Sequence, residues 1–390
     1  MGSTVRTSAT RRPTAEAAGA ERLAARIDTM SDVLQRAAED MLPFGVLGAA
    51  AMIDLPGAER PVVIAAGSVD RAGGRELSGA ELHPIGSQSR MFAAACVLSL
   101  AREGHFMLDD RISKYIPDIP TVDDHATIDH FINHTSGIGD FAASYDLLPF
   151  PMPTFSFDEL MSLTKLQGRR FVAGSKYEYS NTDIVVLARL CEVVTGEPFE
   201  NVLSARVLEP LGMTDTMVAA GQVLPSDRMA HGYFLPEGAA EDDLVDTASL
   251  ADFSVAAAAG NIISSLPDML TWSRAMLSPG NAIGLSHEDF TTNPVDAHTD
   301  FPHWYTQHVS ARGVEGHTWG GRTFWGHRGG FYGYLSGTLF EPESGVAVSA
   351  FLTMVTRRGI VNLPNEPQTH TFQTFLQLCA RAAVDMVELP

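Results

Sequence analysis

The sequence predicts a mixed α/β (α+β) protein, in which an antiparallel β-sheet flanked by helices is joined to a helical domain. Strand-like segments stand at both ends of the chain, and the middle is rich in helix-like segments. The 390 residues are 45% hydrophobic and 19% charged, which is typical of a large globular protein. We therefore expect a discontinuous sheet domain over 27–100 and 265–390, a mainly helical domain over 101–264, an active-site cleft between them, and a disordered tail over 1–26.

Two pairs of short apolar runs predict β-hairpins. Residues 44–54 and 60–67 flank the turn residues Pro56 and Gly57 near the start of the chain. Near its end, residues 333–340 and 345–353 alternate apolar positions on either side of a four-residue turn. Because strands from both ends contribute to one sheet, the two hairpins are expected to lie side by side.

Helices are predicted where apolar residues recur at three- and four-residue spacing. The segments with this pattern are 87–103, 128–134, 158–166, 181–195, 266–277 and 371–387. Most of them fall between the two hairpins, which is why the middle of the chain is predicted to be helical.

The charge and cysteine content limit the function classes. A formal net charge of −20 disfavours binding to nucleic acid or to an anionic membrane, because both need a basic face. The three cysteines are far apart and show neither a disulfide framework nor zinc spacing. No signal-peptide core or transmembrane run is visible, so we expect a cytoplasmic protein that acts on a small molecule.

The first chemical motif is HPIGSQSRMFAAA, residues 83–95, in which Ser87 precedes an Ala-rich helical stretch. The N-terminus of a helix stabilises developing negative charge, which favours a serine nucleophile and its oxyanion. Residue 90 is three positions further on and shares the face of Ser87. Taken alone, a Gly-Ser pair before a helix is more often a helix cap.

Two further motifs follow. KYEYSN, residues 176–181, places Tyr179 and Asn181 in a loop that enters a helix, where tyrosine can act as a general base if a cation lowers its pKa. WGHRGG, residues 325–330, places His327 before Gly329 and Gly330, which allow close approach of a ligand to the strand backbone. Each motif alone is more often a capping turn or a Gly-rich turn.

Together, in this order and spacing, the three motifs resemble the serine β-lactamase-like and penicillin-binding-protein-like family, in its class C β-lactamase and esterase branch. Its motifs are Ser-x-x-Lys, Tyr-x-Asn and a Lys- or His-x-Gly strand. The stretches 134–141 (HTSGIGDF), 209–216 (EPLGMTDT) and 258–272 also look like that family, and the likeness runs from about residue 30 to the C-terminus. The resemblance implies the serine β-lactamase/penicillin-binding-protein fold.

The resemblance also implies a role for each motif residue. Ser87 would be the acylated nucleophile, Tyr179 its base, and Asn181 an amide that orients the substrate. His327 would be the third-motif residue, and the backbone N–H groups of Ser87 and Gly330 would form the oxyanion hole. No Gly-x-Ser-x-Gly elbow occurs in the sequence, which argues against an α/β-hydrolase.

Arg90 departs from the family pattern, because it stands where Ser-x-x-Lys has lysine. Arginine keeps its proton, with a pKa above about 12, and cannot serve as a base. Two explanations remain open. The change is either drift in a chain with three lysines and twenty-four arginines, or altered chemistry in which Arg90 stabilises a Tyr179 phenolate.

The functional prediction is a serine hydrolase or acyltransferase that acts on an ester, amide or thioester of a small molecule through an acyl-enzyme on Ser87, in biosynthesis or catabolism. One alternative is a non-hydrolytic isomerase, lyase or cyclase that uses Tyr179 and Arg90. Another is a catalytically silent binding homologue. The sequence leaves the substrate and the oligomeric state open.

No metal and no cofactor are predicted. His125, Asp129, His130 and His134 have spacings that bring several side chains near one helical face, but no second cluster supplies further ligands. Packing or solvated histidines are therefore the better interpretation. Neither a phosphate-binding Gly loop nor a dinucleotide fingerprint follows a predicted strand.

Overall fold

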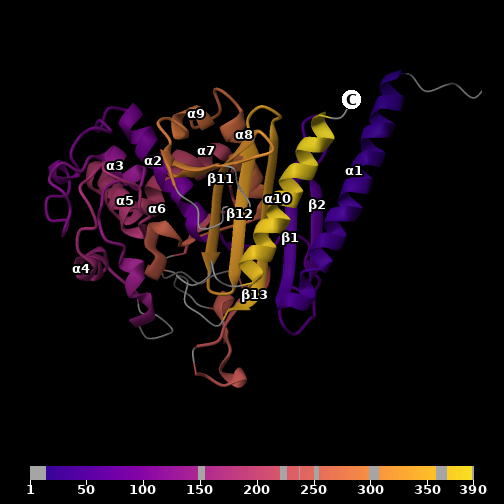
Figure 1. Cartoon of the computed structure of the whole chain (residues 1–390), viewed down its shortest axis with the longest axis horizontal. Helices are drawn as coiled ribbons and strands as arrows, with labels where there is room; N and C mark the ends of the chain where they lie inside the picture. The colour runs from indigo at the N-terminus through magenta and orange to yellow at the C-terminus, as the bar shows by residue number, and fades with distance from the viewer. Residues whose placement is uncertain are drawn as a thin grey trace, which may run out of the picture.

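A long antiparallel sheet lies between two helical layers in the computed structural model (Figure 1). The structure describes residues 15–147, 154–219, 226–236, 238–249, 254–297, 307–356 and 367–388. Its main sheet has the strand order β2-β1-β13-β12-β11-β10-β9-β8, and β5 pairs in parallel with the end of β13. A second, smaller sheet has the order β3-β7-β4. The predicted fold class, an antiparallel sheet with flanking helices, is confirmed.

The strands and helices have the following bounds. The strands are β1 (Val46–Asp54), β2 (Val62–Gly67), β3 (His83–Pro84), β4 (Met217–Val218), β5 (Tyr233–Phe234), β6 (Val245–Asp246), β7 (Ile262–Ser264), β8 (Val295–Asp296), β9 (Gln307–Ala311), β10 (Val314–Trp319), β11 (Arg322–Phe331), β12 (Tyr334–Glu341) and β13 (Val346–Thr356). The helices are α1 (Ala15–Glu39), α2 (Ser89–Arg102), α3 (Ile128–Ile132), α4 (Phe157–Gln167), α5 (Asn181–Thr195), α6 (Phe199–Leu203), α7 (Glu209–Leu211), α8 (Leu266–Leu277), α9 (His287–Phe290) and α10 (Pro367–Glu388).

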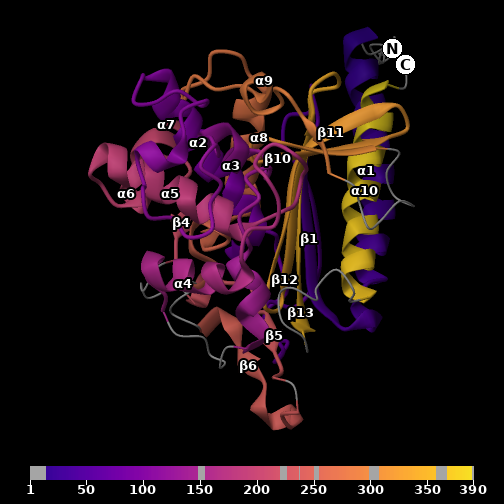
Figure 2. The ribbon, with the colours of Figure 1, turned by 60° about the vertical axis from the view of Figure 1, so that its left-hand side comes forward.

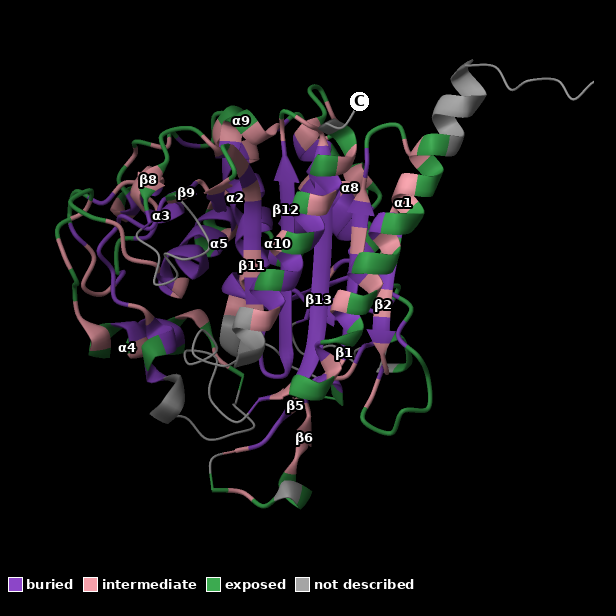
Figure 3. Cartoon of the chain, turned by 45° about the vertical axis from the view of Figure 1, so that its right-hand side comes forward, coloured by how far each residue is buried: buried purple, intermediate pink, exposed green. Residues whose placement is uncertain are grey.

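Strands from the two ends of the chain pair with each other in the main sheet, as the sequence predicts. β1 lies between β2 and β13, with Ala50 opposite Phe351 on one side and opposite Ala65 on the other. Both predicted hairpins form, and Gly57 occupies the first turn with a φ of 84°. β12 is buried along its whole length (Figure 3), because helices cover both faces of the sheet.

Helices α1 and α10 lie side by side on one face of the sheet (Figure 2). Met30, Leu34 and Ala38 of α1 are buried in one apolar cluster with residues of β1, β13 and α10. Arg26 also donates to the carbonyl of Met386 at 3.0 Å, which ties α1 to α10.

The prediction of a disordered tail over 1–26 is wrong for residues 15–26, which belong to α1. The helical spacing of Met30, Leu34 and Ala38 gives α1 an apolar face that packs on the sheet, and the helix continues toward the N-terminus from there. The rest of the predicted tail, 1–14, lies outside the described residues.

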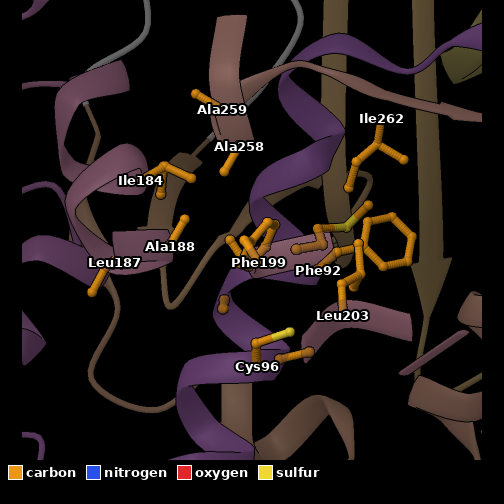
Figure 4. Packing of buried hydrophobic residues seen from close by; sticks show 14 of the residues in the cluster. Phe92, Cys96, Ile184, Leu187, Ala188, Phe199, Leu203, Ala258, Ala259 and Ile262 are labelled. Atoms are coloured by element: carbon orange, nitrogen blue, oxygen red, sulfur yellow. The ribbon is translucent and has the colours of Figure 1, made fainter. Parts of the chain in front are cut away.

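The opposite face of the sheet carries α8 and the helical lobe. The core of the lobe is packed around α2, where Phe92 and Cys96 lie close to residues of α5 and α6 such as Ala188, Phe199 and Leu203 (Figure 4). Full burial of a Phe or Leu side chain contributes roughly 1.5–3 kcal/mol. This apolar packing fixes the position of α2 and of the turn that precedes it.

Sequence periodicity located most helices well. α5 and α8 have the predicted bounds, and α4 differs by one residue at each end. α5 ends at Gly196 in the left-handed conformation, with a φ of 75°, which is a common helix terminator. Strands β9 and β10 were not predicted, because their polar and Gly-rich sequences lack an apolar alternation.

The division into two domains stays a prediction. Its boundary at residue 100 falls inside α2, which packs in the core of the helical lobe. Within the described ranges, no helix is long and apolar enough to cross a membrane.

Candidate active site

Ser87 lies in a short 3-10 turn, η2 (Gly86–Gln88), directly before α2. Its side chain is partly exposed, whereas both neighbours in the turn are buried. The turn is held against the sheet, since Gln88 donates from Nε2 to Ser336 Oγ at 2.7 Å and Ser336 donates to the carbonyl of Ile85 at 2.9 Å. The predicted nucleophile is thus at the entry to a buried helix, on a rigid support.

Tyr179 and Ser87 are in direct contact. The Tyr179 hydroxyl donates a hydrogen bond to Ser87 Oγ at 2.9 Å. Tyr179 comes from the loop before α5, and Asn181 is the first residue of that helix. The first two motifs, about ninety residues apart in the sequence, are therefore brought together at one point.

Arg90 is completely buried beside them. Its Nη1 donates to the carbonyls of Ser87 at 3.1 Å and Ala259 at 3.3 Å, and its Nη2 donates to Asn181 Oδ1 at 2.7 Å. The guanidinium carbon also lies 4.0 Å from the centroid of the Tyr179 ring. Arg90 therefore contacts the site on several sides, and its guanidinium does not point toward solvent.

Asn181 connects Arg90 to a half-buried acid, Asp140. Its Oδ1 accepts from Arg90, and its Nδ2 donates to Asp140 Oδ2 at 2.9 Å. These two partners fix the orientation of the carboxamide, because a carboxylate only accepts and a guanidinium only donates. Burial raises the pKa of Asp140, although hydrogen bonds from Ala142 and Asn181 and the nearby Arg90 act in the opposite direction.

The phenol of Tyr179 is subject to opposing influences. Burial raises its pKa above the ordinary value, whereas the Arg90 charge and the hydrogen bond with Ser87 lower it. The burial effect is larger, so the resting side chain is the neutral phenol, in agreement with its donor role toward Ser87. Arg90 stabilises the phenolate once it forms.

The third motif lies against the Ser87 turn. A Cβ added to Gly86 would come within 2.7 Å of the Gly330 carbonyl oxygen and 2.8 Å of its nitrogen, and a Cβ on Gly329 would collide with the Ile85 carbonyl. Glycine at these positions therefore lets the backbones of η2 and β11 approach each other. The backbone nitrogens of Ser87 and Gly330 belong to these two adjacent segments.

His327 of β11 faces the same region. Its ring centroid is 6.4 Å from that of Tyr179, and its Nε2 is 3.8 Å from Glu315 Oε1. Nδ1 contacts the carbonyl of Arg328, which only accepts, so Nδ1 carries the proton. Burial lowers the pKa of His327 to about 4 against the opposing influence of Glu315, so the imidazole is neutral at pH 7.

A buried pair that the sequence analysis did not assign lies behind Tyr179. His134 Nδ1 is 2.8 Å from Asp183 Oδ2, and the Ser136 hydroxyl donates to Asp183 Oδ1 at 2.5 Å. The His134 ring centroid is 5.0 Å from that of Tyr179. Burial favours the uncharged pair, since it raises the pKa of Asp183 and lowers that of His134 to about 3.

The side chains of the histidine-rich stretch 125–134 do not come together at one site. His130 accepts from the Thr127 backbone and caps α3, whereas His134 turns to Asp183. Asp129 instead pairs with Arg312 at 3.2 Å. The interpretation of the histidines as packing or solvated groups agrees with these contacts and with the exposed position of His125, whereas the capping role of His130 was not predicted.

Sequence reasoning missed Asp140 and Glu315 as members of the site. Asp140 stands in the quoted stretch HTSGIGDF, but nothing in the sequence shows that it meets Asn181. Glu315 lies on β10, which was not predicted. The buried Asp183, at the third position of α5, gave a usable signal, since an acid on an apolar helix face needs a partner.

Comparison with known proteins gives a consistent set of relatives. A family model described as Beta-lactamase matches residues 42–363. Esterase EstB of Burkholderia gladioli is 30% identical over 223 residues, 54% of this chain and 55% of the esterase. Penicillin-binding protein 4* of Bacillus subtilis (strain 168) is 30% identical over 165 residues, 41% of this chain and 36% of that protein. The matches thus span about half or less of these curated relatives.

Solved structures show the same fold. D-amino acid amidase from Ochrobactrum anthropi SV3 has a TM-score of 0.77 at 23% identity and covers 91% of this chain and 99% of its own. A D-stereospecific amidohydrolase from Streptomyces sp. has a TM-score of 0.71 at 25% identity, over 83% of this chain and 94% of its own.

Proposed function

This chain belongs to the β-lactamase family, and from that premise we propose that it is a serine hydrolase that acts on an ester or amide of a small molecule. The observation that carries the proposal is the 2.9 Å hydrogen bond between Tyr179 and Ser87 Oγ. A serine within hydrogen-bond reach of a proton acceptor, itself held by a third group, is the arrangement of an activated nucleophile. Arg90 is that third group here.

The proposed acylation step begins with the Tyr179 phenolate. It takes the proton of Ser87 as Oγ attacks the carbonyl carbon of the substrate. The carbonyl π electrons move to its oxygen, which the backbone N–H groups of Ser87 and Gly330 would stabilise. Collapse of the tetrahedral intermediate breaks the bond to the leaving group, which takes the proton from Tyr179. Water then attacks the acyl-enzyme by the same route and restores Ser87.

Arg90 acts as a fixed cation in this scheme. It cannot exchange a proton at working pH, so the base must be Tyr179 rather than the residue in the lysine position. Its contacts with Ser87, Ala259 and Asn181 hold the charge beside the phenol. This arrangement supports a tyrosine base that is assisted by arginine.

The Arg90–Tyr179 contact also supports a second candidate, a non-hydrolytic isomerase, lyase or cyclase. A phenolate stabilised by a fixed cation can remove a proton from carbon without any acyl-enzyme. In that case Ser87 would bind the substrate rather than attack it.

The proposal has three further parts. They are a biosynthetic or catabolic role, transfer of the acyl group to an acceptor other than water, and a cytoplasmic location.

The experiment that separates the candidates compares Ser87→Ala with Tyr179→Phe on a panel of activated esters, thioesters and amides. For a serine hydrolase we expect Ser87→Ala to abolish turnover and Tyr179→Phe to lower kcat by about 10²–10⁴. Turnover that survives Ser87→Ala and disappears in Tyr179→Phe would replace the hydrolase by the proton-transfer enzyme. Unchanged turnover in both variants would refute both candidates.

A further inference from the structure

We propose that His308, Glu315 and His317 form a binding site for one divalent transition-metal ion of the zinc class. One donor atom from each residue lies within 4.8 Å of the other two. It is the one such His, Cys and carboxylate group within the described part of the chain. The proposal does not rest on the proposed function, since it concerns ion binding beside the third motif.

The sheet places the three side chains on one face. His317 of β10 is the register partner of His308 of β9, so their side chains lie on the same side of the sheet. Glu315 is two residues before His317 on β10 and therefore points the same way. Three neighbouring positions of a hydrogen-bonded strand pair carry the donors, which gives them a rigid backbone support.

The donor atoms are close and shielded from water. His317 Nε2 is 3.1 Å from Glu315 Oε2, and His308 Nε2 is 3.7 Å from Glu315 Oε1. Two donors on a tetrahedral zinc ion lie about 3.4 Å apart, given bonds of about 2.0–2.1 Å. The side chains of His308, Glu315 and His317 are 9%, 9% and 1% exposed. Small rotations of buried rings would complete the coordination.

The donor types select the kind of ion. Two imidazole nitrogens and one carboxylate suit zinc, and also cobalt or nickel, whereas magnesium and calcium prefer sites built from oxygen. No spacing in the sequence indicates this group, because the fold brings its members together through two strands that were not predicted.

Arg328 is expected to lower the affinity of this site for a metal ion. Its Nη2 is 3.3 Å from Glu315 Oε2, and its Nη1 donates to Gln373 at 3.1 Å. This cation competes with a metal ion for the same carboxylate. We therefore expect Arg328→Gln to tighten metal binding, whereas loss of either histidine weakens it.

The test is a calorimetric titration of the full chain with zinc chloride, after removal of metals by chelation. We expect one ion per chain. His308→Gln and His317→Gln should each weaken binding by about tenfold or more. His125→Gln, at an exposed histidine, should bind as the wild type does, and Arg328→Gln should bind more tightly.

Failure of the wild type to take up an ion would overturn the proposal, and so would an affinity equal to that of the wild type in both histidine variants. If either variant does not fold, the wild type with cobalt chloride decides. A visible spectrum of cobalt bound by imidazole and carboxylate supports the site, and the spectrum of hydrated cobalt rejects it. Neither readout uses turnover, so the result is independent of the proposed hydrolysis.

Discussion

The guanidinium of Arg90 lies over the ring of Tyr179, with Cζ 4.0 Å from the ring centroid. A cation in this position is attracted by the face of an aromatic ring and stabilises negative charge on the phenol oxygen. The same arginine holds Asn181 Oδ1 and the Ser87 carbonyl. One permanently charged side chain thus contacts Ser87, Tyr179 and Asn181, the candidate site residues of the first two motifs.

Arg90→Lys is expected to speed ester hydrolysis near neutral pH by about tenfold or more. A buried lysine can lose its proton and act as a second base, which arginine cannot do. The variant should also be less stable, because the shorter ammonium leaves buried acceptors unpaired at about 1–3 kcal/mol each. Steady-state kinetics and thermal unfolding measure both effects.

Arg90→Met is the matched control for charge, since it keeps much of the volume and removes the cation. It should lower the rate with esters below that of the wild type. If Arg90→Lys and Arg90→Met both lose the activity of the wild type, the guanidinium itself is required. The non-hydrolytic candidate predicts that result.

The pH profile of kcat/KM should rise into the alkaline range. In the proposed mechanism the active form of Tyr179 is the phenolate, and burial raises the pKa of the phenol above its ordinary value. The rate therefore increases as pH rises through that pKa. Arg90→Met should move this limb to higher pH, because it removes the charge that lowers the pKa. A profile that falls with alkaline pH would exclude Tyr179 as the base.

Gly86→Ala should slow covalent modification of Ser87 by about 10²–10³. Gly86 has a φ of 53°, and an added Cβ would come within 2.7–2.8 Å of the Gly330 backbone. The methyl group would push β11 away from η2. It would thereby separate the backbone N–H groups of Ser87 and Gly330, which form the proposed oxyanion hole. Gly104→Ala is the control, because its φ is also positive, at 84°, but an added Cβ meets nothing within 4 Å. Equal effects of the two substitutions would contradict the assigned geometry.

His83→Phe should make folding less sensitive to acid. His83 is fully buried, stacks on Phe351 with centroids 4.1 Å apart, and has a pKa lowered by burial to about 4. The unfolded value is about 6.5, so the neutral imidazole contributes stability that is present above pH 6.5 and lost as pH falls toward 4. Denaturant unfolding between about pH 7 and 5 should show a smaller loss in the variant. Identical pH slopes would refute this linkage.

Much of the fold could be predicted from the sequence, because the local patterns of apolar and turn residues agree with the tertiary structure. The hairpin around Gly57 and the helix α5 were predicted from apolar periodicity and turn residues, and the structure confirms both. The whole of α1 was missed: residues 15–26 were assigned to a disordered tail and 27–39 to no helix, since the first turns carry alanine but few large apolar side chains and the helix is held by its later packing face. β9 and β10 were missed because polar residues such as Glu315 and His317 point into a buried polar cluster.

The site was predictable only in part. The sequence identified Ser87, Arg90, Tyr179, Asn181 and His327 as candidates, and the structure brings them into one region. Their chemical roles stay predictions. Contacts between distant segments, such as that of Asn181 with Asp140, depend on how α5 packs, and no local pattern encodes them.

Intact-protein mass after exposure to a fluorophosphonate and to activated esters tests the central claim most directly. We expect a single adduct on the wild-type chain and none on Ser87→Ala, because the proposed mechanism makes Ser87 Oγ, which accepts a hydrogen bond from Tyr179, the nucleophile. An equal adduct on both proteins, or none on a folded wild type with any probe, would contradict the claim that this family member works through an acylated Ser87.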